Sequence, residues 1–131
     1  MELDLKVIDK PANILLLSVT GRIKAGDIKP LENEFRRICK GPPVKLILNV
    51  QGVEAIDSSG IGELIRARKE ILGKGGRVVL LGVNSRVEMM VKLSGLDNYF
   101  PIAPTESEAI QVLNQPPAEP PKEEPAEPPA E

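Results

Sequence analysis

Apolar and polar residues alternate near the start of the chain with the two-residue period of a half-buried β-strand. Segment 3–8 (LDLKVI) has this alternation, and a second apolar segment, 14–19 (ILLLSV), follows shortly after it. Residues 9–13 (DKPAN) between them are typical of a turn. The pattern therefore predicts a β-hairpin at the beginning of the fold.

Helical and strand periods then alternate. A helix is predicted where Leu31, Phe35 and Ile38 share one face, and a run of glycine and proline ends it. The strands that follow are almost wholly apolar, as expected for strands covered on both faces of a sheet. The expected elements are helices over about 25–40 and 58–72 and strands over 44–50 and 77–81.

The rest of the pattern predicts two more helices and a short strand. Ser85 opens a capping-box sequence (SRVE) for a helix whose end is marked by Gly95. Segment 99–102 is expected to be an edge strand, because Pro101 has no N–H to donate to a neighbour. With a last helix over 105–113, the order is ββαβαβαβα. This order predicts an α/β fold, in which a mixed sheet of about five strands is packed with four helices.

The composition changes sharply after Gln115. Residues 116–131 contain seven of the 13 prolines, five glutamates and one lysine, but no leucine, isoleucine, valine or aromatic residue. Such a segment buries too little apolar surface to repay its ordering entropy, so we expect a disordered, polyproline-like tail. The predicted organisation is one domain over 1–115 and a tail over 116–131, which is either a docking segment or spacer, or a solvated terminus.

The inventory of reactive side chains argues against an enzyme. The chain has no histidine and a single cysteine, Cys39, which excludes histidine-based triads, Cys–His pairs and the usual zinc sites within one chain. The commonest general base near neutral pH is therefore absent. We expect no catalytic residue, no metal site and no bound cofactor.

Charge and hydropathy restrict the partners further. Residues 1–115 carry 16 basic and 14 acidic side chains, and the chain has two phenylalanines, one tyrosine and no tryptophan, which gives little support for nucleic-acid binding. No apolar run reaches the roughly 20 residues of a membrane span, and the acidic start does not resemble a signal peptide. We therefore expect a cytoplasmic protein without direct membrane insertion.

Segment 57–62 (DSSGIG) carries the candidate chemistry. It lies between an apolar strand and an amphipathic helix, where unpaired backbone N–H groups and the helix dipole favour negative charge. Asp57 or Ser58 could simply cap the helix, or a kinase could phosphorylate Ser58 or Ser59, which both lie near the helix start. A hydrolase nucleophile at Ser58 is disfavoured, because there is no histidine base and Ile56 replaces the first glycine of a GxSxG elbow.

Several motifs occur together with this segment in one order. They are LSVTGRI (17–23), DSSGIG (57–62), GKGG (73–76), VVLLGVNSRV (78–87) and LSGLDNYF (93–100). In this order they resemble the STAS family, which includes bacterial anti-sigma-factor antagonists (anti-anti-sigma factors) and the tails of sulfate transporters. The resemblance covers roughly residues 3–114.

The resemblance implies a regulator of transcription that works by partner switching. The unmodified antagonist binds an anti-sigma factor that is also a serine kinase, and this binding releases the sigma factor. The kinase then phosphorylates the first serine after the aspartate, which is Ser58 here, and the complex separates. A serine phosphatase restores the antagonist, and any nucleotide belongs to the kinase.

The predicted partner-binding surface combines this segment with the loop before the first helix. Its residues are Gly21, Arg22, Lys24, Asp27, Asp57, Ser58, Ser59, Gly60, Ile61 and Gly62. Lys24 stands where many antagonists of the family carry an acid, and it could pair with a phosphate on Ser58 if the two loops lie close. This departure keeps open a non-switching STAS module, such as a stressosome-like scaffold or the cytoplasmic subunit of a lipid or anion transporter.

Overall fold

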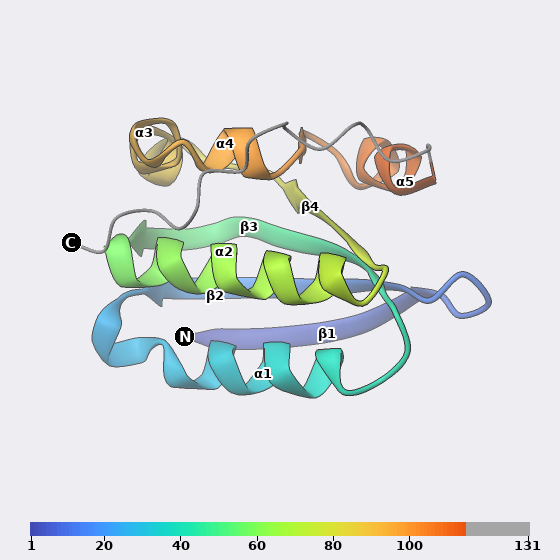
Figure 1. The fold of residues 1–131 in the computed structure, drawn as a ribbon. Coiled ribbons are helices and arrows are strands. Elements are labelled where there is room, and N and C mark those ends of the chain that lie inside the picture. The colour runs from blue at the N-terminus through green and yellow to red at the C-terminus, as the bar shows by residue number, and fades with distance from the viewer. Residues whose placement is uncertain (115–131) are drawn as a thin grey trace.

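A computed structural model describes residues 1–114, in which five strands form one sheet (Figure 1). The predicted tail over 116–131 lies outside the described residues. The elements are β1 (Glu2–Asp9), β2 (Ile14–Ile23), η1 (Ala25–Asp27), α1 (Lys29–Cys39), β3 (Lys45–Ile56), α2 (Ser58–Gly73), β4 (Arg77–Leu81), α3 (Ser85–Ser94), α4 (Leu96–Tyr99), β5 (Ile102–Ala103) and α5 (Glu106–Asn114).

The strands lie in the sheet in sequence order, β1-β2-β3-β4-β5. β1 and β2 form the predicted antiparallel hairpin, and each later strand is parallel to the one before it, so the predicted mixed sheet is confirmed. β2 and β3 run further than predicted and stay paired to their last residues, Ile23 and Ile56. The two strands therefore end at the same edge of the sheet, where α2 begins.

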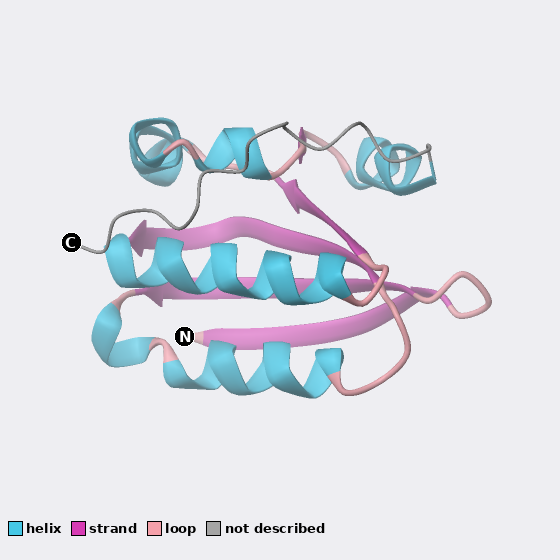
Figure 2. Cartoon of the chain, in the orientation of Figure 1, coloured by secondary structure: helices cyan, strands magenta, loops and turns pink. Residues whose placement is uncertain are grey.

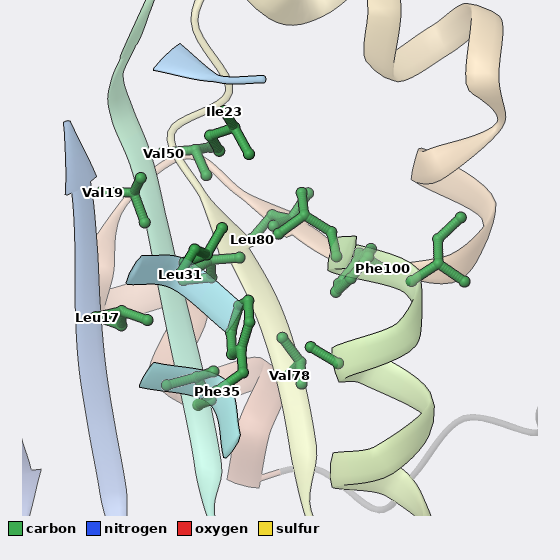
Figure 3. Packing of buried hydrophobic residues seen from close by; sticks show 14 of the residues in the cluster. Leu17, Val19, Ile23, Leu31, Phe35, Val50, Val78, Leu80 and Phe100 are labelled. Carbon is green, nitrogen blue, oxygen red and sulfur yellow. The ribbon is translucent and has the colours of Figure 1, made fainter. Parts of the chain in front are cut away.

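Helices cover both faces of the sheet. Residues of α1, α2, α3 and α4 belong to the larger apolar cluster on one face, and α5 packs Ala109 and Leu113 on the other face against Ile47 and Val79. Figure 3 shows part of the larger cluster, with Phe35 of α1 among side chains of β2 and β4. Because β3 contributes buried residues to both clusters, it is the central strand that the apolar segment 44–50 predicts.

The helices differ from the prediction in number and in their ends. Among the described residues there are five α-helices and a 3-10 turn, rather than four helices (Figure 2). The chain between α3 and α4 breaks at Gly95, which adopts the left-handed conformation with φ 74° and ends α3 as predicted. The residues after this break form the short α4 before the chain reaches β5.

Two local predictions near these helices were wrong. Asn84, and not Ser85, caps α3, because its side chain accepts hydrogen bonds from the N–H groups of Arg86 and Val87. The edge strand lies at Ile102–Ala103 and not at 99–102, since Tyr99 still belongs to α4. The carbonyl of Pro101 accepts from the N–H of Leu80, a bond that needs no N–H on the proline.

Candidate partner-binding surface around Ser58

Asp57 forms the junction between β3 and α2. Its backbone is extended (φ −116°, ψ −175°), and its Oδ1 accepts a hydrogen bond of 3.0 Å from the N–H of Gly60. Asp57 is therefore the N-cap of α2, and Ser58 is the first residue of the helix. Of the two capping residues that the sequence allows, the structure selects Asp57.

The other carboxylate oxygen of Asp57 reaches the loop that follows β2. Its Oδ2 accepts a hydrogen bond of 3.1 Å from the N–H of Ala25, and the N–H of Asp57 donates to the carbonyl of Ile23 at 3.3 Å. One side chain thus joins the loop after β2 to the start of α2. The two predicted parts of the surface, 21–27 and 57–62, lie side by side.

Gly60 fixes this junction by close packing. A Cβ atom at Gly60 would lie 2.2 Å from the carbonyl oxygen of Ile23 and 2.9 Å from the side chain of Ile56. No side chain fits there, so the first turn of α2 can approach the end of β2 only with glycine at this position.

The first turn of α2 offers small groups on its outer side. Ser58, Ser59 and Gly62 are exposed, and neither serine hydroxyl makes a hydrogen bond within the described part of the chain. A Cβ atom at Gly62 would meet nothing within 4 Å. The Ser58 hydroxyl is therefore open to a partner and stands at the end of the helix where the dipole favours negative charge.

The charge of Asp57 is stabilised by its surroundings. Desolvation by burial opposes ionisation, but hydrogen bonds from backbone N–H groups, those of Gly60 and Ala25 first, outweigh it and lower the pKa of Asp57. The exposed ammonium of Lys24 adds a smaller attraction in the same direction. The surface beside Ser58 thus holds a fixed carboxylate with a cation near it.

The ten predicted surface residues differ in how much they expose. Arg22, Lys24, Ser58, Ser59 and Gly62 are exposed, whereas Gly21, Asp27 and Asp57 are half-buried and Gly60 and Ile61 are buried. The buried pair builds the junction, and the exposed residues form its outer surface. The prediction missed the N–H of Ala25, because a backbone donor leaves no signal in the sequence.

Among residues 1–114, no group of three or more carboxylate, thiol or imidazole side chains is placed to hold a metal ion. None of the helices there has the length and apolar character of a membrane span. Cys39 is buried as predicted, and burial raises the pKa of its thiol. A thiol of this kind is a poor nucleophile at neutral pH.

Comparisons with known proteins agree on one family. The model of the STAS domain matches residues 6–109. The chain is 36% identical over 67 residues to a provisionally named anti-sigma factor antagonist of Thermotoga maritima, covering 51% of this chain and 59% of that protein. It is 32% identical over 78 residues to the anti-sigma F factor antagonist of Paenibacillus polymyxa, covering 60% and 63%. The match spans about three-fifths of the length of these relatives.

Solved structures show the same fold. An anti-sigma factor antagonist from Mycobacterium paratuberculosis superposes with a TM-score of 0.75 at 22% identity, covering 87% of this chain and 94% of that one. The phosphorylated form of SpoIIAA from Bacillus superposes with a TM-score of 0.64 at 22% identity, covering 84% and 97%.

Proposed function

The chain belongs to the STAS family, and from this premise we propose that it is an anti-sigma factor antagonist that switches partners through Ser58. The observation that carries the proposal is an exposed hydroxyl, without a hydrogen-bond partner among the described residues, in the first turn of α2. Curated relatives named as antagonists support the same role. In its unmodified form, the chain binds an anti-sigma factor through the exposed residues around Ser58.

The covalent step needs chemistry that the partner supplies. The anti-sigma factor acts as a serine kinase: the Ser58 oxygen attacks the γ-phosphorus of ATP, ADP leaves, and the hydroxyl proton passes to a base of the kinase. A separate phosphatase returns the serine by hydrolysis and releases inorganic phosphate. The chain itself contributes the acceptor hydroxyl and has no histidine that could serve as the base.

Electrostatics explains why the modified chain would leave its partner. A phosphate adds about −1.5 to −2 charges and three acceptor oxygens beside the ionised Asp57. A partner surface that fits a neutral hydroxyl then faces an anion it cannot pair, and such a mismatch at an interface costs several kcal/mol. Since about 1.4 kcal/mol corresponds to a tenfold change in affinity, a local change suffices to end the interaction.

Lys24 belongs to the same proposed surface. The hydrogen bond from Ala25 to Asp57 holds the loop that carries Lys24 next to the start of α2. Because the two loops lie close together, Lys24 could pair with a phosphate on Ser58. We therefore include Lys24 among the residues that distinguish the two states of the chain.

The first experiment is an intact-mass measurement and a phosphopeptide map of the protein isolated from its own cells. A phosphate on Ser58 that a phosphatase removes would support the switch and would justify isolation of the kinase. With that kinase, Ser58→Ala should bind and remain bound in ATP, Ser58→Asp should bind at least tenfold more weakly, and Ser59→Ala serves as the control. Equal affinities of the alanine and aspartate variants would overturn the proposal in favour of a non-switching module.

A further inference from the structure

Positive charge gathers at the end of the molecule opposite the start of α2. The β1–β2 turn, the α1–β3 loop and the α2–β4 turn meet there, as the loop segments in Figure 2 show. Within residues 9–13, 40–45 and 73–77 there are five cations and one carboxylate, Asp9. We call these five cations the basic end: Lys10, Lys40, Lys45, Lys74 and Arg77.

Backbone and side-chain hydrogen bonds hold the three loops together. The side chain of Asn13 donates to the carbonyl of Pro43 at 2.6 Å, and the N–H of Lys45 donates to the carbonyl of Asn13 at 3.0 Å. The N–H of Arg77 donates to the carbonyl of Val44 at 2.9 Å. The basic end is therefore one continuous surface built from segments distant in the sequence.

The four lysines of the basic end form no ion pair within the described residues. Ion pairs in the described residues lie within α1, α2 and α3, and none of them includes Lys10, Lys40, Lys45 or Lys74. Lys10 and Lys40 are exposed, and the Lys74 ammonium donates to the neutral backbone carbonyl of Cys39. The surface therefore favours an acidic partner.

An acidic segment of this chain starts at the same place. Nη1 of Arg77 donates to the carbonyl of Leu113 at 3.0 Å, so α5 ends beside the basic end at Asn114. The following residues 116–131 have five glutamates, one lysine and a net charge of −4, against the net +4 of the three loop segments. They contain no large aliphatic or aromatic residue that would direct them to an apolar surface elsewhere.

We propose that the acidic segment 116–131 docks on the basic end of its own domain. Each exposed pair of charges is weak, but several act together, and the attachment at Asn114 makes every contact intramolecular, with a high effective concentration. The interaction is electrostatic, so salt must weaken it. Docking there keeps the glutamates away from Ser58 and shields the basic end from other polyanions.

A paramagnetic label on the full chain tests the proposal. Ala126→Cys carries a nitroxide, and Cys39 stays unlabelled because it is buried with a raised thiol pKa. We expect the amide signals of Gly41 and Gly75 to lose at least half of their intensity, while that of Gly62 loses little. In 0.5 M NaCl, on the order of a 4 Å screening length, the loss should largely disappear.

Charge reversal supplies the matched comparison. Lys10→Glu with Lys40→Glu should abolish the intensity loss at the basic end. Both lysines are exposed, and neither side chain makes a hydrogen bond in the described residues, so the fold should not change. Arg22→Glu with Lys24→Glu changes the net charge by the same amount at the other end of the molecule. This variant should keep the intensity loss at the basic end. An equal intensity loss at Gly62 and at Gly41 and Gly75 would overturn the docking. So would an intensity loss at the basic end that persists in the variant with Lys10→Glu and Lys40→Glu. Neither outcome depends on whether Ser58 is phosphorylated.

Discussion

At the scale of single residues, the surface around Ser58 depends on the two carboxylate oxygens of Asp57, which hold α2 and the loop after β2 together. Asp57→Ala removes a helix cap and a loop contact, so it should lower the free energy of unfolding by about 1–2 kcal/mol. Urea denaturation at neutral pH measures this loss. Asp27→Ala is the control, because the Asp27 side chain makes no hydrogen bond in the described residues. Equal losses in the two variants would contradict the role of Asp57.

The pKa of Asp57 adds a dependence on pH with a definite sign. Because its pKa is lowered in the folded state, the ionised group stabilises the fold above its unfolded pKa of about 3.9. This stabilisation is lost as the pH falls through the folded pKa. The stability difference between the wild type and Asp57→Asn should be full at pH 7 and shrink below pH ~4. A difference that stays constant from neutral to acidic pH would show that the charge contributes nothing.

Glycine at position 62 makes α2 less stable than alanine would, and no contact among the described residues of the domain requires a glycine there. It lies in α2 with an ordinary backbone and open space where a Cβ would stand, and glycine in a helix is less stable than alanine by about 0.8–1 kcal/mol. Gly62→Ala should therefore raise stability. On the proposed function, in which the anti-sigma factor contacts the helix backbone beside Ser58, the same change should weaken binding. Gly73→Ala is the matched control in the same helix, equally open but distant from Ser58. Calorimetry that finds binding unchanged in both variants would refute the contact.

At the scale of elements, α2 contains an ion-pair network within the helix, between Glu63, Arg66 and Glu70. Glu63 is buried, and Arg66 donates to both of its oxygens at 2.9 and 2.7 Å and to Glu70 at 2.8 Å. Arg66→Gln leaves the Glu63 carboxylate buried without its cation, and should cost about 1–3 kcal/mol in chemical denaturation. Adding Glu63→Gln should recover part of that loss, since the buried charge is then gone.

The exposed ion pair of α1 is the comparison for this network. Arg37 pairs with Glu34 at 2.5 Å, but its side chain is 67% exposed. Solvent screening makes such pairs weak, so Arg37→Gln should change stability by less than about 0.5 kcal/mol. If the variants at Arg66 and Arg37 cost the same, burial of Glu63 adds nothing to what the network contributes to stability.

The sequence predicts elements well where periodicity acts alone. The hairpin, the central strand and α2 follow from the spacing of apolar residues, because that spacing decides which face is buried. The ends of elements depend instead on tertiary contacts. β3 extends to Ile56 because β2 pairs with it over this length, and Asn84 caps α3 because its amide also bonds the carbonyls of Gln51 and Val53. These partners are distant in the sequence, so no local pattern reveals them.

The candidate site was predictable to a similar extent. The DSSG segment (57–60) marks a helix start by itself, and the order of motifs places it in a family. The role of Gly60 in close packing and the bond from Ala25 to Asp57 arise only when the ends of β2 and β3 meet. Residue types therefore predict the position of the surface, and the sheet decides which of the predicted residues face outward.

At the scale of the whole molecule, the surface around Ser58 is built on closely packed ends of β2, β3 and α2. β2 and β3 end together at the edge from which α2 starts, and the start of α2 packs on Ile23 with no room for a side chain at Gly60. A group added to the Ser58 oxygen points outward from this junction. We therefore expect the fold to stay the same when a phosphate is added to Ser58.

Phosphorylation of Ser58 should accordingly alter binding without altering the fold. A dianion at a helix N-terminus is favourable by about 0.3–1 kcal/mol, which offsets its repulsion with Asp57, so the midpoint of thermal unfolding should move by only a few degrees. Amide shifts in the ¹H–¹⁵N spectrum should change in the loop that carries Lys24 and in the first turn of α2, and not in α5. Ser59→Ala, phosphorylated at Ser58, should give the same map. Shifts spread across the sheet, or a large loss of stability, would mean that the switch acts by refolding the domain and not by presenting a charge to its partner.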